Sequence, residues 1–320
     1  MIRNFMISAA ASLILMGCTA GDKTDAANAA NDVAEKTVEA APLQNTAEAA
    51  SEALTDKTDT ARLAGIIDNQ SAAAKARFAA RHPQETLEFF GVKPGMTVIE
   101  VLPGGGWYTK IISPFLGADG HLVGVDYDFK MWSEFGGFAD AKFIKERETW
   151  ADGWTADMAS AIGEDASQLS AYPLGKLPPS LKGEADMVIL IRALHNMVRF
   201  NEKGGYLDSA LKELHASLKP GGIVGIVQHA GPEVNEDSWA DGNNGYLKQS
   251  FVIAQMEKAG FEFVASSDVN KNPRDIPSNS DIVWRLPPSL GTSKDDAELR
   301  ARMEAIGESN RMTLKFTKPE

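Results

Sequence analysis

The residues best suited to chemistry follow short apolar runs that read as buried strands. Glu100 stands in one such run, and a proline and three glycines follow it, Gly104, Gly105 and Gly106. Glycine lacks a Cβ atom, so a loop of this kind lets a ligand approach the backbone closely. The helix predicted after the loop would offer free backbone N–H groups. Residues 100–106 therefore form a candidate ligand site, although a tight strand-to-helix turn would need the same glycines.

Five further polar residues come after predicted strands: Asp126, Arg192, His195, Asn196 and His229. His195 can exchange a proton near neutral pH and Asn196 can orient a substrate, so these two are the predicted catalytic residues. Arg192 and His229 are the predicted substrate-binding residues, since an arginine can hold a carboxylate. Structural roles remain open: His195 as a helix cap, His229 as a buried polar residue, and Arg192 as the partner of an acid such as Asp126.

A mainly parallel sheet would bring these residues together. Apolar runs alternate with helical segments, which indicates a Rossmann-like α/β fold with helices on both faces of the sheet and an antiparallel strand at the C-terminal end. Ligands of such sheets bind beyond the carboxyl ends of the strands. The predicted strands lie at residues 97–102, 121–126, 187–191, 223–229, 261–266 and 312–319.

Two cofactor classes use a glycine loop after a first strand. A dinucleotide site has the spacing G-x-G-x-x-G, with an acid about 20 residues further on. Here Thr109 takes the third glycine position, while Asp126 stands at a suitable distance for a ribose in either class. An acid within the first strand, as at Glu100, suits a cofactor that carries a cationic amino group instead.

In these features the sequence resembles the class I S-adenosylmethionine-dependent methyltransferases. Their first motif is an acid followed by alternating glycines, which reads EVLPGGG here, with Leu102 in place of the first glycine and Pro103 added. "LKPGG" at 218–222 matches the turn before their fifth strand. The resemblance runs from about Thr60 onward. It implies S-adenosylmethionine as the cofactor, bound by Glu100, the three glycines and the acid that ends the second strand.

A narrower resemblance joins segments far apart in the chain. They are similar to those of predicted bacterial methyltransferases, often exported, and give no substrate. The segments are "RHPQETLEFFGVKPGMTVIEVLPGGGWYT", "RALHN", "NPRD", "WRLPPS" and "LKFTKP".

The N-terminus predicts export. Arg3 precedes an apolar run that is too short to span a bilayer and is typical of a secretory signal peptide. The ending "LMGC" resembles the lipobox of bacterial lipoproteins. It implies a signal peptide at 1–17, lipid on Cys18, and a protein anchored at the outer membrane and facing the periplasm. Residues 18–58 contain few large apolar side chains and are predicted to be a disordered tether. The methyltransferase-like domain would then be 59–320.

Composition narrows the function further. The net charge of −12 argues against a nucleic-acid partner, and a single cysteine excludes an internal disulfide. No Cys/His cluster suggests a metal. The favoured function is methyl transfer from S-adenosylmethionine to an unknown acceptor, which is a small molecule or a partner of another kind. Because that cofactor is made in the cytoplasm, the rival interpretation is a non-enzymatic exported binding protein. A weaker alternative is an NAD(P)-dependent oxidoreductase. The acceptor and the oligomeric state stay open.

Overall fold

The computed structural model describes the backbone of residues 43–320 and the side chains of residues 56–320. The chain divides after residue 48, and the fold presented below is that of residues 49–320. The predicted signal peptide and Cys18 lie outside the described residues.

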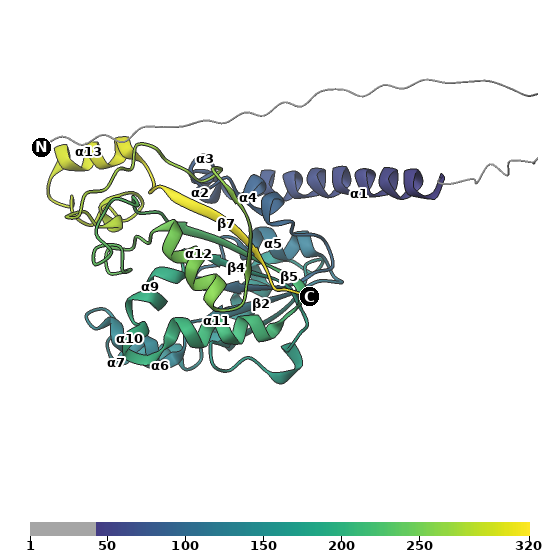
Figure 1. The fold of residues 1–320 in the computed structure, drawn as a ribbon, viewed down its shortest axis with the longest axis horizontal. Helices are drawn as coiled ribbons and strands as arrows, with labels where there is room; N and C mark the ends of the chain where they lie inside the picture. Colours follow the sequence, from purple (N-terminus) through teal and green to yellow (C-terminus); the bar gives the residue numbers. More distant parts are fainter. Residues whose placement is uncertain (1–42) are drawn as a thin grey trace, which may run out of the picture. The chain divides into compact units, whose positions relative to one another are not determined.

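A seven-stranded sheet forms the centre of the described chain (Figure 1). The strands are β1 (Thr97–Val101), β2 (His121–Asp126), β3 (Gln168–Pro173), β4 (Ala185–Ile191), β5 (Leu218–His229), β6 (Glu262–Ser267) and β7 (Arg311–Thr317). The longer helices are α1 (Leu43–Asp68), α4 (Pro83–Phe90), α5 (Thr109–Leu116), α7 (Ala141–Arg147), α8 (Trp150–Ile162), α9 (Leu194–Arg199), α11 (Tyr206–Ser217), α12 (Gln249–Lys258) and α13 (Ala297–Ile306). Single turns of helix are α2 (Ala72–Lys75), α3 (Phe78–Arg81), α6 (Phe129–Trp132), α10 (Asn201–Gly204), η1 (Ser133–Phe135), η2 (Pro179–Leu181) and η3 (Val283–Arg285).

The strand order is β3-β2-β1-β4-β5-β7-β6. The strands from β3 to β5 pair in parallel, whereas β7 runs antiparallel to both β5 and β6. The predicted Rossmann-like fold with an antiparallel C-terminal strand is therefore confirmed. The order reverses between β1 and β4, and the crevice at such a reversal is where doubly wound sheets bind ligands.

Helices cover both faces of the sheet (Figure 1). On one face, α9, α11 and α12 pack against strand residues that include Ile99 and Val101. On the other face, α4 and α5 pack against Val98. Successive residues of a strand point to opposite faces, so Glu100 lies on the side of α5. Glu100 is therefore a polar residue placed between a buried strand and a buried helix.

Helix α1 differs from the predicted tether. It begins at Leu43, so residues 43–58 are helical, whereas the sequence predicts disorder up to residue 58. Alanine is common in this segment and is the best helix former. Near the end of the helix, Leu63 and Ile67 are buried in the core beside α5. Because isolated helices are marginal in water, this packing supplies the stability that local propensity lacks.

Candidate functional site

The backbone is left-handed at the residue that follows each of the two central strands. Leu102 after β1 and Arg192 after β4 both have a φ of 57°. The Leu102 N–H donates to the Val125 carbonyl, and the Arg192 N–H donates to the Val227 carbonyl, each at 2.7 Å. Side chains other than glycine cost about 1–2 kcal/mol in this conformation. Leu102 thus replaces the first glycine of the motif and keeps a backbone that glycine adopts readily. Such strain gathers at functional sites.

The three loop glycines have different surroundings. Gly104 and Gly105 are exposed, and a Cβ built on either would meet no atom within 4 Å. Gly104 also has a φ of 56°. Gly106 is buried, with a φ of 75°, and its Cβ would lie 2.2 Å from the Met158 sulfur on α8. The loop is therefore open to a ligand at Gly104 and Gly105, while Gly106 allows close packing against α8.

Glu100 lies under the loop and is almost completely buried. The Thr109 hydroxyl, at the first residue of α5, donates a hydrogen bond of 2.7 Å to its Oε2 atom. Burial raises the pKa of Glu100 to about 7, and the hydrogen bond from Thr109 opposes that rise. No cation of the described chain pairs with this carboxyl group. Its visible role is to hold the start of α5, and a contact with a cofactor amino group stays a prediction.

Asp126 ends β2, as predicted, and both of its oxygens accept hydrogen bonds. The Tyr127 N–H donates to Oδ1 at 2.9 Å, while Trp132 Nε1 and Arg147 Nη1 donate to Oδ2 at 3.3 and 3.2 Å. Burial raises the pKa of Asp126 against these contacts. A cavity of about 250 Å³ lies beside it, walled by aromatic rings such as Trp150.

His195 and Asn196 are neighbours on α9 but face different strands. Asn196 Nδ2 donates to the Tyr127 hydroxyl at 3.2 Å, so it lies toward the end of β2. The Gln228 side-chain amide lies 3.3 Å from His195 Nδ1, so the imidazole lies toward the end of β5. Burial lowers the pKa of His195 to about 4. The imidazole is therefore neutral near pH 7 and is a weak proton acceptor there.

His229 ends β5 and lies next to His195. The centroids of the two rings are 5.6 Å apart, and His229 Nδ1 lies 2.6 Å from the Ser309 hydroxyl. Burial, together with the charges of His195 and Arg192, lowers the pKa of His229 well below its ordinary value. The structure thus brings His195 and His229 together, as neutral hydrogen-bonding groups rather than as a charged pair.

Arg192 pairs with neither Asp126 nor Glu100, which sequence reasoning left open. No hydrogen bond or ion pair of its side chain is found among the described residues, and its Nε atom is buried without a partner. Burial, together with the charges of Arg81 and Arg311, lowers its pKa to about 9. Its side chain is half-buried and has no acid partner among the described residues, so Arg192 is a candidate for contact with an anionic ligand.

Several residues of the site have no motif that would have revealed them. Arg147 reaches Asp126 from α7, and Thr109 reaches Glu100 from α5. Arg81 and Arg311 approach Arg192 from opposite ends of the chain, which no local pattern shows. The order of the strands could have predicted that Arg311 lies near the site. Because β7 runs antiparallel to β5, its first residue lies opposite His229.

The sequence segments "NPRD" and "WRLPPS" meet beside this site. Arg285 Nη2 donates to the buried Asp275 carboxylate at 2.9 Å, and the Tyr246 hydroxyl donates to it at the same distance. The backbone N–H of Asn310 also donates to Asp275, at 2.8 Å. Asn310 directly precedes Arg311. The network therefore fixes the chain just before β7 and positions Arg311 at the edge of the site.

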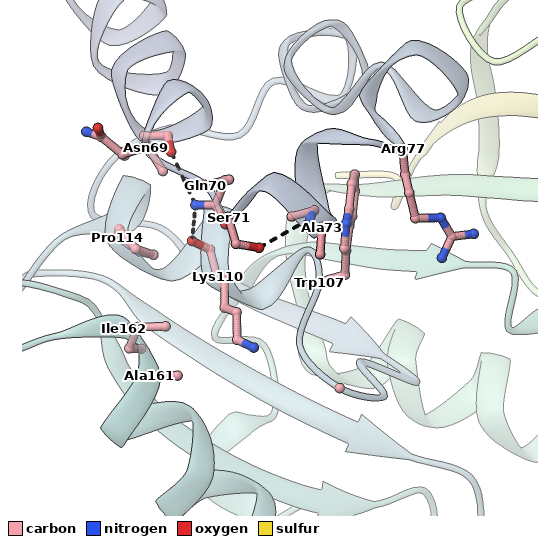
Figure 2. Close-up of a pocket in the computed structure, with 13 residues that line it drawn as sticks. Asn69, Gln70, Ser71, Ala73, Arg77, Trp107, Lys110, Pro114, Ala161 and Ile162 are labelled. Atoms are coloured by element: carbon pink, nitrogen blue, oxygen red, sulfur yellow. Dashed lines mark hydrogen bonds between the residues drawn. The ribbon is translucent and has the colours of Figure 1, made fainter. Parts of the chain in front are cut away.

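A larger cavity, of about 760 Å³, lies away from Asp126 (Figure 2). It is bounded by the end of α1, by α2 and by the start of α5, and it includes Gly105, Trp107 and Arg77. Gln70 closes one side, because its side-chain amide donates to the Lys110 carbonyl at 3.1 Å (Figure 2). Of the predicted site residues, only Gly105 lines this cavity, so it adjoins the glycine loop from the outer side.

The described residues contain no group of three or more His, Cys, Asp or Glu side chains arranged to hold a metal ion. They also include no helix that is long and apolar enough to cross a membrane.

Comparisons with known proteins find a likeness in structure alone. No family model matches the sequence, and no curated protein matches it significantly. The cyclase SpnF is 18% identical over 75% of this chain and 80% of its own, with a TM-score of 0.45. An S-adenosylmethionine-dependent methyltransferase from Aquifex aeolicus is 20% identical over 65% and 93%, with a TM-score of 0.41. A methyltransferase from Mesorhizobium loti that depends on the same cofactor is 11% identical over 73% and 96%, also with a TM-score of 0.41.

The residues at the ends of β1 and β2 fit S-adenosylmethionine. Gly104 and Gly105 leave the backbone open for close approach, and Asp126 offers acceptor oxygens at the end of the neighbouring strand. Tyr127 and Trp132 place aromatic surface beside that carboxylate. The fit is weaker at the buried Glu100. A cationic amino group would reach its carboxyl only through the loop or a bridging water.

Proposed function

We propose that this protein binds S-adenosylmethionine at the ends of β1 and β2 and transfers its methyl group to a small-molecule acceptor. One observation carries the proposal. An open glycine loop and a strand-end carboxylate, Asp126, lie at the ends of neighbouring strands, β1 and β2, next to the point at which the strand order reverses. When bound, the cofactor supplies an electrophilic methyl group on a sulfonium centre.

The chain's own residues would hold and orient the two reactants. Gly104 and Gly105 would allow the cofactor to approach the backbone, and Asp126 would accept hydrogen bonds from its ribose. Asn196 is held by Tyr127 beside Asp126, so it is placed to orient an acceptor. His195 is neutral because burial lowers its pKa, so it can accept a hydrogen bond from the acceptor. Methyl transfer depends first on such alignment.

Removal of the Asp126 carboxylate tests the cofactor site. We expect Asp126→Ala to weaken binding of S-adenosylhomocysteine by about ten-fold or more, because a hydrogen bond to a charged group contributes about 1.5–3 kcal/mol. Titration calorimetry on the folded protein measures this. The variant also leaves Arg147 without its acid, so the folded fraction is checked by circular dichroism. Asp119→Ala, which removes an exposed carboxylate, is the matched control.

The same titration separates the rival functions. Binding of NAD in place of S-adenosylhomocysteine would favour an oxidoreductase. A folded wild-type protein that binds neither S-adenosylhomocysteine nor S-adenosylmethionine at millimolar concentration would favour the exported binding protein and end the methyltransferase proposal.

Export as a lipoprotein is the second part of the proposal, and the sequence "LMGC" supports it. Lipid on Cys18 would anchor the protein at the outer membrane, with its folded part in the periplasm. Cys18→Ser should therefore leave the protein unlipidated and release it from the membrane fraction, since only the cysteine sulfur accepts the first lipid. Membrane fractionation checks this, with Thr19→Ala as the control that keeps the cysteine. Equal retention of Cys18→Ser and wild type would contradict the anchor.

A further inference from the structure

Three arginines share one glutamate at the edge of the sheet. Arg77 Nη2 lies 2.7 Å from the Glu308 carboxylate, Arg81 Nε lies 3.1 Å from it, and Arg311 Nη1 lies 3.2 Å from it. Burial raises the pKa of Glu308, but the charges of Arg81 and Arg311 outweigh this and lower it, so the carboxylate is ionised. The single negative charge of Glu308 is thus shared by the positive charges of three arginines.

Arg192 adds a fourth positive charge to this group. It follows β4 directly, and Arg311 begins β7, two strands further along the sheet. The charges of Arg81, Arg311 and Arg77 all act on Arg192. The Tyr108 hydroxyl donates to the Arg81 carbonyl at 3.4 Å. Burial raises the pKa of Tyr108, and the positive charges of Arg311, Arg81 and Arg192 oppose that rise. Arg311 lies opposite His229 at the end of β5, and Arg192 follows β4, which pairs with β5, so the four arginines gather toward the carboxyl ends of β4 and β5. We call them the arginine site.

The arginine site contains donors that the chain does not satisfy. The side chains of Arg81 and Arg311 are each 4% exposed. Arg81 Nη2, Arg192 Nε, Arg311 Nε and the indole Nε1 of Trp107 are all buried without a hydrogen-bond partner. Buried charges in proteins are normally paired, and an unpaired one costs several kcal/mol. A folded chain that keeps this excess of buried positive charge is suited to an anion.

We propose that the arginine site binds a carboxylate or phosphate group of the methyl acceptor, so the substrate of the proposed methyl transfer is a small oxyanion-bearing molecule. A guanidinium is planar and presents a fork of N–H donors that matches two oxygens of either group. This assignment rests on the proposed function for the identity of the ligand as an acceptor. The anion-binding property itself depends only on the arginines.

The position of the arginine site favours the acceptor over the cofactor. The cofactor residues Gly104 and Asp126 lie at the ends of β1 and β2. Arg192 follows β4 and Arg311 begins β7, across the point where the strand order reverses. Trp107 joins the two regions, because it follows the glycine loop and its ring lies 5.1 Å from the Arg81 guanidinium carbon. A ligand held by the arginines would thus lie beside the cofactor, as methyl transfer requires.

The larger cavity borders the arginine site. Arg77 belongs to both, and its side chain is 28% exposed, so the site is accessible at that point. Figure 2 shows Arg77, Trp107 and Lys110 among the residues that line this cavity. The cavity volume of about 760 Å³ lies within the range of small-molecule sites, about 300–1,000 Å³.

Inorganic phosphate and malonate are the probes for this proposal, and Arg192→Met is the variant. Methionine keeps the length of the side chain and removes the charge. We expect wild type to bind at least one probe with millimolar affinity or better, measured by calorimetry and by a rise in Tm. Arg192→Met should weaken that binding at least ten-fold, and Arg192→Lys should fall between. Arg302→Met, which removes an exposed arginine on α13, should change nothing. The stronger probe indicates whether phosphate or carboxylate is preferred.

Two analogues of the cofactor test whether the arginine site binds an anionic group of the acceptor or the carboxylate of the cofactor itself. S-adenosylhomocysteine carries a carboxylate, and 5′-methylthioadenosine does not. Unchanged affinity of Arg192→Met for both supports the acceptor assignment. Loss of affinity for S-adenosylhomocysteine alone would overturn it, because the arginine would then hold the cofactor carboxylate. Binding of neither probe by the folded wild type would also overturn it.

Two controls keep the outcomes distinct. If the wild type binds phosphate or malonate but not S-adenosylhomocysteine, the proposed methyl transfer fails, and with it the acceptor assignment, while the anion site stands. Folding of Arg192→Met is checked by its Tm without ligand. We expect that Tm to match or exceed the wild-type value, because the substitution removes a half-buried charge that has no acid partner and is repelled by the other arginines.

Discussion

Glu100→Gln will make the protein more stable than the wild type above pH 7, by about 3 kcal/mol, and will leave its stability near pH 4.5 almost unchanged. The cause is the burial of a carboxyl group without a cation, which raises the pKa of Glu100 from 4.5 to about 7. Each pKa unit corresponds to about 1.4 kcal/mol. This effect is large compared with the total stability of a domain, about 5–15 kcal/mol.

The direction of the pH dependence follows from the proton balance. The unfolded chain releases the Glu100 proton near pH 4.5, and the folded protein releases it near pH 7. Between these values the folded state holds the extra proton, so the free energy of unfolding falls as the pH rises through this window. Glutamine keeps an oxygen that can accept the hydrogen bond from Thr109, and it cannot ionise.

Urea unfolding at about pH 5 and about pH 8 measures the difference between the two proteins at each pH. Glu202→Gln, which alters an exposed glutamate, is the matched control and should show no such difference. A constant gap between wild type and Glu100→Gln at both pH values would show that the buried carboxyl does not titrate in this window.

Alanine at Gly106 will mainly lower the stability of the protein, whereas alanine at Gly104 will mainly weaken ligand binding. Gly106→Ala will lower the free energy of unfolding by about 3 kcal/mol, since it adds left-handed strain of about 1–2 kcal/mol and crowds a packed helix for about 1–3 kcal/mol. The added Cβ would lie 2.2 Å from the Met158 sulfur, and the methionine must move. Gly104→Ala will cost about 1 kcal/mol, because its Cβ points into open space.

For ligand affinity we expect the larger loss from Gly104→Ala and the smaller loss from Gly106→Ala. Gly104→Ala should weaken S-adenosylhomocysteine binding by about ten-fold or more, because the new methyl group stands where the ligand must approach the backbone. Thermal unfolding and calorimetry on the same two proteins give both quantities. A loop that serves packing alone would give a wild type that does not bind, with each substitution affecting stability only.

The sequence was sufficient to place the strand-end residues but not their partners. Apolar runs marked β1, β2, β4 and β5, so the positions of Glu100, Asp126 and His229 could be predicted. Strand β3 was not identified, because it lies at the edge of the sheet and only one of its residues is fully buried, which leaves no apolar run. Edge strands carry a weaker pattern for this reason.

The arginine site could not have been predicted from local patterns. Arg81 and Glu308 stand 227 positions apart, so only the packing of α3 against the chain before β7 brings them together. The charge of Arg192 was visible in the sequence, but its lack of an acid partner is a property of the folded chain. Likewise, Asp275 and Arg285 were visible only as parts of two separate segments, and their ion pair appears on folding.

The position of β7 between β5 and β6 has a consequence for how the protein folds while it is being synthesised. β5 is complete at His229, yet the strand that pairs with its outer edge begins only at Arg311. Until that later segment emerges, β5 has a free edge of unpaired backbone groups and apolar side chains, which favours aggregation. Closing so long a loop is slow, because its entropy is lost before any contact forms. The nascent chain therefore has a period in which an unfinished sheet needs shielding, and insertion of β7 ends it.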